Sequence, residues 1–190
     1  MLKILNRNKK YLIFVLVIIV ISFLSGIVYY ILLNEDIKLN ITNTLVNNSL
    51  KYNSTIKDLI IMSSLFVAAF FIIGVPLNIF YLFYEFLSYG FLITVFTHNY
   101  GLSGLFYGIL SILLNELIIM IIVICFLKKL INISRLIIGR IIYKNDLSLK
   151  NKLLFNVYNS LYIIVIVFVL NLILSFINPK IFSHLVFLLK

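Results

Sequence analysis

Long apolar stretches separated by short polar ones make up most of this chain of 190 residues. The apolar stretches cover residues 11–33, 59–97, 105–127 and 153–176. A helix of about 20 apolar residues matches the hydrocarbon core of a bilayer, and the second stretch is long enough for two such helices. The pattern therefore predicts an all-α, polytopic membrane protein, with a bundle of about five transmembrane helices in a single domain over residues 1–190.

The apolar stretch 59–97 has to turn back on itself to provide two spans. Gly74 and Pro76 favour a break at that point, because proline lacks a backbone donor and disfavours helix in the residue before it. The alternative is one long helix that turns near residues 85–90. The break at the proline predicts spans over residues 59–75 and 77–97.

The distribution of charge predicts how the chain crosses the membrane. The net charge is +10, but the basic residues flank the apolar stretches, which argues against a nucleic-acid partner. Residues 1–10 contain four basic residues and no acid, and residues 128–152 contain seven basic residues and one acid. Such segments face the cytoplasm. An even number of crossings must separate them, so we predict N-in, C-out topology, with an outer loop over residues 34–58 and a cytoplasmic basic loop over residues 128–152.

The basic loop has a helical pattern of its own. Leu130, Ile133, Ile137 and Ile141 fall on one arc of a helix, opposite polar and cationic residues. This pattern predicts an amphipathic helix in the cytoplasmic interface, with its cations near anionic headgroups. The alternative is that the segment extends the fourth transmembrane helix. The last apolar run, residues 181–189, is too short to span and is expected on the outer surface.

Glu85 and Glu116 are the two ionisable residues well inside predicted spans. A charged carboxylate is costly at that depth, and such residues often belong to ion or proton pathways. On neighbouring antiparallel helices the two carboxyls could approach each other and form a proton or cation relay. The alternative is hydrogen bonding between helices with Asn78 or Asn115, and Asn171 is also expected to fix packing.

The remaining motifs indicate packing rather than chemistry. Gly104 and Gly108 form a small-xxx-small pair, which lets membrane helices approach closely. His98 and His184 are isolated, and no cluster of Cys, His and Asp has metal-ligand spacing. We therefore predict no metal, no cofactor, no catalytic residue and no enzymatic activity. The candidate helix-break and packing positions are Gly74, Pro76, Gly90, Gly101, Gly104 and Gly108.

Several short motifs follow one another between Gly74 and Met120. They are GVPL at 74–77, EFLSYGF at 85–91, YGLSGLF at 100–106 and LSILLNEL at 110–117. This order resembles the stage II sporulation protein M family, whose members have a Gly-x-Pro, a Lys-Gly-Phe-like segment, a Tyr-Gly-x-x-Gly-Leu-like turn and a Leu-Pro-Gln-Asn-like segment. Two positions depart from the pattern. Glu85 stands near the usual lysine, and Leu114-Asn115-Glu116 replaces Pro-Gln-Asn.

The resemblance implies a non-enzymatic membrane scaffold that acts during engulfment in endospore formation. Its implied partners are two peptidoglycan hydrolases, the stage II sporulation proteins D and P, beside the lipid bilayer itself. It also implies a multi-pass protein of the bacterial cell membrane, at the septal or engulfing membrane. The outer loop 34–58 and the turn 98–104 would meet the partners. The alternative function is a small transporter or permease subunit that uses Glu85 and Glu116.

Overall fold

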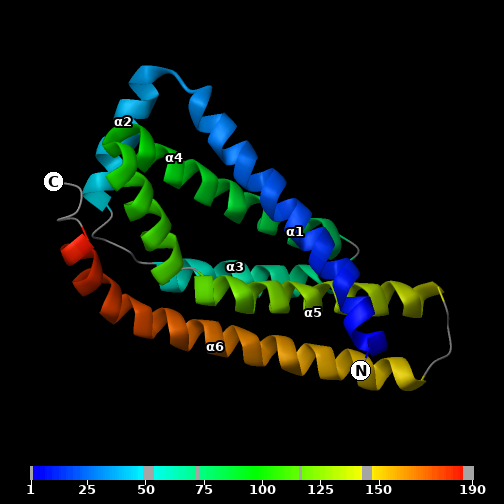
Figure 1. Ribbon diagram of the computed structural model, residues 1–190. Helices are drawn as coiled ribbons and strands as arrows, with labels where there is room; N and C mark the ends of the chain where they lie inside the picture. The colour runs from blue at the N-terminus through cyan, green and yellow to red at the C-terminus, as the bar shows by residue number, and fades with distance from the viewer. Residues whose placement is uncertain (1, 49–53, 72, 116, 143–146, 186–190) are drawn as a thin grey trace. The chain divides into compact units, whose positions relative to one another are not determined.

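The computed structural model describes all of the chain except residues 1, 49–53, 72, 116, 143–146 and 186–190. In the part that is described, the chain forms six α-helices and no strand (Figure 1). The all-α prediction is therefore confirmed for these residues. The helices are α1 (Leu2–Ile31), α2 (Glu35–Asn48), α3 (Ser54–Ala68), α4 (Gly74–Asn115), α5 (Leu117–Ile142) and α6 (Leu147–Leu185).

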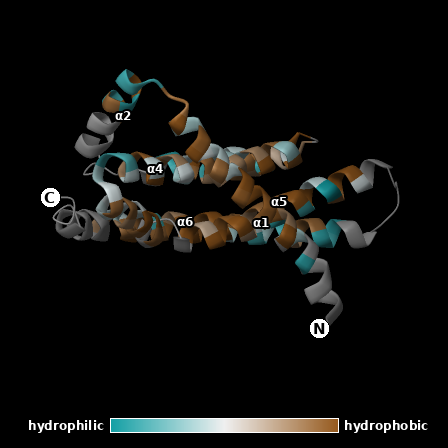
Figure 2. Cartoon of the chain, turned by 45° about the horizontal axis from the view of Figure 1, so that its top comes forward, coloured by the Kyte–Doolittle hydropathy of each residue, from teal (hydrophilic) through white to brown (hydrophobic). Residues whose placement is uncertain are grey.

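Three helical segments are long and apolar enough to cross a bilayer, namely Ile13–Ile31, Gly74–Leu113 and Lys150–Phe176. Figure 2 shows hydrophobic residues along much of α1 and α6. Many large apolar side chains on these segments are exposed. Helices of this kind suit an apolar solvent, since all of their backbone groups bond within the helix. The chain is thus a membrane protein by composition and structure, while five spans and their orientation stay predictions.

The chain divides into two compact units, which are described separately. Unit 1 consists chiefly of residues 1–46 and 80–109, and contains α1, most of α2 and the central part of α4. Unit 2 consists chiefly of residues 47–79 and 110–188, and contains α3, α5, α6 and both ends of α4.

In unit 1, α1 and α4 approach until their backbones touch. A methyl group at Gly26 would overlap the carbonyl oxygen of Leu87, and one at Gly90 would overlap the carbonyl oxygen of Phe23. Glycine is required at both positions because any side chain would push the helices apart. This is the close helix approach that small residues permit in membranes.

α1 and this part of α4 run in the same general direction and cross near Gly26 and Gly90. Phe23 lies against Gly90, and further along both helices the ring of Tyr30 lies against His98. Figure 1 shows the same general direction.

Gly101 bends α4 sharply. Its φ of 58° and ψ of −136° lie outside the helical region, in a conformation that glycine adopts readily and residues with a Cβ atom do not. The bend divides α4 into a first arm, residues 74–100, and a second arm, residues 102–115. It falls within the predicted turn over residues 98–104.

The break between α3 and α4 comes slightly earlier than the sequence predicts. α3 ends at Ala68 and α4 begins at Gly74, so the helix over the predicted span 59–75 is shorter than expected. Pro76 lies in the first turn of α4, where its missing N–H leaves no helical hydrogen bond unmade. The proline therefore begins the second helix rather than ending the first.

The predicted outer loop, residues 34–58, contains α2. The carbonyl oxygen of Asn34 accepts hydrogen bonds from the backbone N–H groups of Ile37 and Lys38, both at 3.1 Å. Glu35 and Asp36 occupy the first turn, where carboxylates complement the helix dipole. Asparagine just before the first turn is a favoured helix start. The predicted outer loop therefore contains a helix over residues 35–48, and its position outside the membrane stays a prediction.

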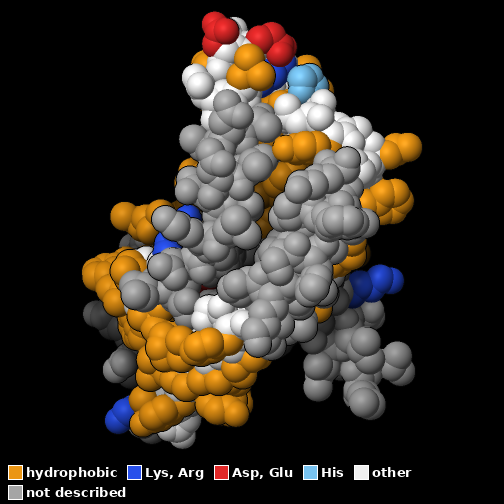
Figure 3. All heavy atoms as spheres, turned by 90° about the vertical axis from the view of Figure 1, so that its left-hand side faces the viewer, with side chains coloured by type: hydrophobic (Ala, Val, Ile, Leu, Met, Phe, Trp, Pro, Cys, Tyr) orange, Lys and Arg blue, Asp and Glu red, His pale blue; other side chains and the backbone are white. Residues whose placement is uncertain are grey.

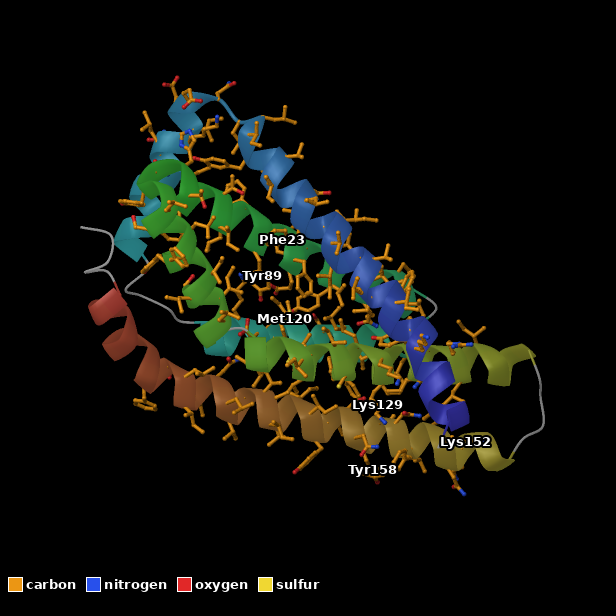
Figure 4. The ribbon with its side chains drawn as sticks, viewed as in Figure 1. Phe23, Tyr89, Met120, Lys129, Lys152 and Tyr158 are labelled. Carbon is orange, nitrogen blue, oxygen red and sulfur yellow. The ribbon has the colours of Figure 1, made fainter. Side chains whose placement is uncertain are left out.

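In unit 2, α6 packs against both α5 and α3. Figure 1 shows α5 and α6 side by side and antiparallel. Lys129 of α5 lies over the ring of Phe155 of α6, with its Nζ 5.4 Å from the ring centroid. Figure 4 shows Lys129 between the two helices. Buried apolar residues of α5 line the core, among them Phe126, Leu127, Leu130 and Ile133.

The segment after Leu127 continues the preceding helix, as in the alternative interpretation, and its position at the cytoplasmic interface stays a prediction. α5 continues through Lys128 and Lys129 as far as Ile142. Of its apolar arc, Leu130 and Ile133 are fully buried within the protein and Ile137 is half-buried, while the side chain of Ile141 lies outside the described part. The neighbouring Ser134 donates a hydrogen bond to a backbone carbonyl near the end of α3.

Two further boundaries differ from the predicted spans. The range 105–127 is divided between the second arm of α4 and the start of α5, with residue 116 outside the description. α6 extends beyond the predicted span 153–176 at both ends and includes the first part of the run 181–189.

Candidate functional site

Polar side chains gather at one end of unit 1, where α1 ends, α2 begins and α4 bends. Figure 3 shows acidic side chains exposed at the top of this view, with a histidine next to them. We call this group the polar cap. It consists of Tyr30, Glu35, Asp36, Lys38, His98 and Asn99.

Lys38 joins α2 to α1 within the polar cap. Its Nζ donates a hydrogen bond to Oε1 of Glu35 at 2.8 Å and lies 5.6 Å from the centroid of the Tyr30 ring. Only 9% of Lys38 is exposed, whereas the side chain of Glu35 is 73% exposed. A largely buried ammonium group needs partners, and here a carboxylate and an aromatic face provide them.

Tyr30 joins α1 to the first arm of α4. Its ring is almost fully buried and meets the rings of Phe91 and His98 edge to face, at centroid distances of 5.5 and 5.7 Å. The side chain of Asn99 lies beside the Tyr30 hydroxyl, but no described residue forms a hydrogen bond of good geometry with that oxygen. Asn99 instead donates to the carbonyl oxygen of Val95 at 2.7 Å.

The cap keeps Glu35 ionised. The hydrogen bond from Lys38, and then the positive charge of Lys38, lower the pKa of the Glu35 carboxyl below its ordinary value of 4.5. Slight burial acts in the opposite sense, and His98 lowers the pKa a little further. At neutral pH the carboxyl is therefore an exposed negative charge beside a buried positive one.

Of the two predicted intramembrane carboxylates, the structure describes only Glu85. Glu85 lies half-buried on the first arm of α4, in unit 1. Glu116 lies outside the described residues. The predicted approach of its carboxyl to that of Glu85 therefore stays a prediction. Asn115 is the last residue of α4, and its side chain is also outside the description.

The asparagines within the helices have different roles. Asn78 is buried, and its Nδ2 donates to the carbonyl oxygen of Gly74 at 2.7 Å, within the first turn of α4. Its Oδ1 forms no hydrogen bond with any described residue. Asn171 matches the expectation of a packing residue, because its Nδ2 donates to Oδ2 of Asp58 at 3.0 Å and so joins α6 to α3.

The glycine pair of the second arm packs against the first arm of the same helix. A methyl group at Gly104 would overlap the carbonyl oxygen of Phe96, and one at Gly108 would come within 3.3 Å of the Cα atom of Ile93. The ring of Tyr107 lies on Phe96 with centroids 4.9 Å apart. The pair therefore closes the bend at Gly101 rather than joining two separate helices.

Sequence reasoning missed the polar cap. It treated His98 as isolated and residues 34–58, which include Lys38, as an outer loop. The spacing of Glu35 and Lys38, which suits a helical ion pair, was the one signal available. The contacts with Tyr30 and His98 depend on how the helices pack, which no local pattern reveals. Comparison of the chain with protein-family models, curated proteins and solved structures finds no match.

Proposed function

We propose that this protein is a non-enzymatic membrane scaffold that localises peptidoglycan hydrolases during engulfment in endospore formation. The observation that carries the proposal is that the start of the segment 34–58 and the start of the turn 98–104, two segments expected to meet partners, come together in the polar cap. Lys38 of the first segment and His98 of the second both contact the ring of Tyr30. A surface fixed in this way loses less conformational entropy on binding than two separate loops would.

The positions of the motif glycines support the resemblance to the stage II sporulation protein M family. Gly90 touches the backbone of α1, Gly101 has a positive φ, and Gly104 touches the first arm of α4. Each lies where a side chain would clash or strain the backbone. These three motif glycines thus have structural roles in this chain. By this resemblance the partners are the stage II sporulation proteins D and P.

The direction of the helices supports the proposed five-span, N-in, C-out topology in the cell membrane. This topology requires α1 and the first arm of α4 to run from inside to outside, and Figure 1 shows the two running in the same general direction in unit 1. It requires α5 and α6 to run in opposite directions, and they are antiparallel in unit 2. The basic residues 1–10 lie at the start of α1 and the polar cap at its end, as the positive-inside rule requires for an outer cap.

Co-purification with the two hydrolases tests the function. The full chain is expressed with tagged stage II sporulation proteins D and P and purified in mild detergent. We expect both hydrolases to co-elute with the wild type and to be lost with Tyr30→Ala, which releases α2 from α4. Tyr29→Ala is the matched control, because Tyr29 is 55% exposed and outside the polar cap. Failure of the wild type to retain either hydrolase would contradict the proposal.

Replacement of the two carboxyls distinguishes the transporter alternative from the scaffold function. The double variant Glu85→Gln, Glu116→Gln should retain the hydrolases if the protein is a scaffold. Ion flux into proteoliposomes that the wild type supports and the double variant abolishes would instead establish a relay.

Cysteine labelling tests the orientation. In a Cys125→Ser background, an impermeant maleimide applied to intact cells should label a cysteine placed at residue 39 and leave one at residue 140 unlabelled. The reverse pattern would place the polar cap in the cytoplasm and remove it as a surface for cell-wall hydrolases.

A further inference from the structure

Unit 2 gathers positive charge at one end of the α5–α6 pair. The described basic side chains of the two helices are Lys128, Lys129, Arg135, Lys150 and Lys152. Neither α5 nor α6 contains an acidic residue. Among the described residues of unit 2 the one acid is Asp58, which accepts a hydrogen bond from Asn171. That position lies about 16 residues, or roughly 24 Å, along α6 from Phe155. The two helices therefore supply no carboxylate to balance the charge at this end.

Lys129 is the cation held between the two helices. Its Nζ lies 5.4 Å from the centroid of the Phe155 ring, and the residue is half-buried, whereas Lys152 is exposed. Figure 4 shows Lys129 beside the part of α6 that carries Lys152 and Tyr158. An aromatic face attracts an ammonium group but does not neutralise it. A half-buried cation on helices without acids needs an anion from outside the pair.

The surroundings of Lys129 indicate the chemistry of that anion. The part of α6 that is apolar and long enough to cross a bilayer begins at Lys150. Phe155 therefore lies in the first turns of this segment, at the depth where phospholipid headgroups meet acyl chains. Phe155, Tyr158 and Tyr162 are 63%, 68% and 67% exposed and have the spacing of one helix face. An exposed aromatic face that leads from cations into the apolar segment suits an acyl chain attached to a phosphate, and not a soluble anion.

We propose that Lys129 and Lys152 bind the headgroup phosphate of an anionic phospholipid, whose acyl chain lies along the face of Phe155, Tyr158 and Tyr162. Lys152 is one helical turn before Phe155 on α6, and Lys129 lies over the Phe155 ring from α5, so both lysines border the same ring. Basic pockets between membrane helices bind anionic headgroups in this way. The inference goes beyond the proposed function and does not depend on it, because it concerns the lipid around unit 2 and not the polar cap.

Native mass spectrometry of the full chain in neutral detergent tests the inference. Phosphatidylglycerol and phosphatidylcholine with identical acyl chains are added separately, and the affinity for the first bound lipid is measured. We expect phosphatidylglycerol to bind more tightly, because its headgroup is anionic and that of phosphatidylcholine has no net charge. An excess of glycerol 3-phosphate, which has the phosphate without acyl chains, should not displace the bound phosphatidylglycerol.

Variants of single lysines locate the phosphate. Lys129→Gln and Lys152→Gln should each weaken phosphatidylglycerol by roughly fivefold, the effect of one basic residue near an anionic surface, and leave phosphatidylcholine unchanged. Lys129→Arg keeps the charge above the ring and should bind as the wild type does. Lys57→Gln is the matched control, because it removes the same charge from an exposed position of α3 next to Asp58, and it should leave the affinity unchanged. Tyr158→Ala should weaken both lipids alike.

Several results would overturn the inference. Equal affinity of the wild type for the two lipids would remove the role of headgroup charge. A loss with Lys57→Gln as large as that with Lys129→Gln would attribute binding to net charge alone. Displacement by glycerol 3-phosphate would assign the lysines to a soluble phosphate. Lys152→Gln keeps the test decisive if Lys129→Gln alters the packing of α5 on α6, because Lys152 is exposed. Unchanged phosphatidylglycerol affinity in Lys152→Gln would also contradict the site.

Discussion

The two units hold their helices together in different ways. In unit 1 the helices meet at glycines, with backbone against backbone at Gly26 and Gly90, and the polar cap closes one end. In unit 2 the helices meet through side chains. Ser134 Oγ donates to the carbonyl oxygen of Ala69 at 2.7 Å, and Asn171 joins Asp58 across α6 and α3.

The difference shows two solutions to one physical problem. In lipid, burying an apolar side chain against a neighbouring helix gains little, because lipid tails are equally apolar. Close van der Waals packing between small residues is one remedy, and hydrogen bonds between helices are the other. Unit 1 relies mainly on the first and unit 2 on the second, so the two units should respond to different substitutions.

The largest effect is expected from filling the glycine contacts of unit 1. Gly26→Ala or Gly90→Ala places a methyl group on a backbone oxygen of the facing helix, and should destabilise the protein by about 1–3 kcal/mol or more. Thermal unfolding in detergent measures the change. Gly139→Ala is the matched control, because a methyl group there meets no atom within 4 Å, and it should be neutral or stabilising. Equal destabilisation by all three would contradict backbone contact as the cause.

A second effect in unit 1 concerns the bend in α4. Gly101→Ala keeps every contact but forces a residue with a Cβ atom to a φ of 58° and a ψ of −136°. Strain of this kind costs about 1–3 kcal/mol. Spin labels on the two arms should report a changed distance, or unfolding should occur at lower temperature. An unchanged distance together with unchanged stability would show that the bend does not need glycine.

In unit 2 the informative experiment is a double-mutant cycle on Asn171 and Asp58. Hydrogen bonds between membrane helices contribute about 0.6 kcal/mol on average and rarely more than about 1.7 kcal/mol. We expect Asn171→Leu and Asp58→Asn to show a coupling energy in that range when unfolding is measured by steric trapping. A coupling energy near zero would mean that side-chain packing alone joins α6 to α3.

The smallest effect is expected from pH at the polar cap. Because the pKa of Glu35 is lowered in the folded protein, its contribution is complete above its ordinary value of 4.5 and is lost as the pH falls through the lowered pKa. A spin label at residue 39, in a Cys125→Ser background, should become more mobile over that acidic range. Glu35→Gln should show the mobile state at every pH, whereas a label on α6 should show no transition.

Some parts of this structure follow from local pattern and others do not. The long apolar stretches predict helices correctly, because a run of that length can satisfy its backbone only within itself. The helix α2 was missed although Asn34, Glu35 and Asp36 favour its start and Ile37, Ile41 and Leu45 recur every four residues, because its many asparagines are typical of a polar loop. Pro76 was read as the end of a helix, yet proline is equally suited to the first turn of one.

By itself, the sequence determined that this is a helical membrane protein, and its charge asymmetry predicts which ends of the helices face the cytoplasm. Both properties depend on sums along the chain, such as apolar length and the number of basic residues. Only the tertiary structure decided that Leu130 and Ile133 of α5 are buried in protein, and that Tyr30, Lys38 and His98 meet. Those contacts join residues far apart in sequence, and they depend on how closely glycines allow the helices to approach.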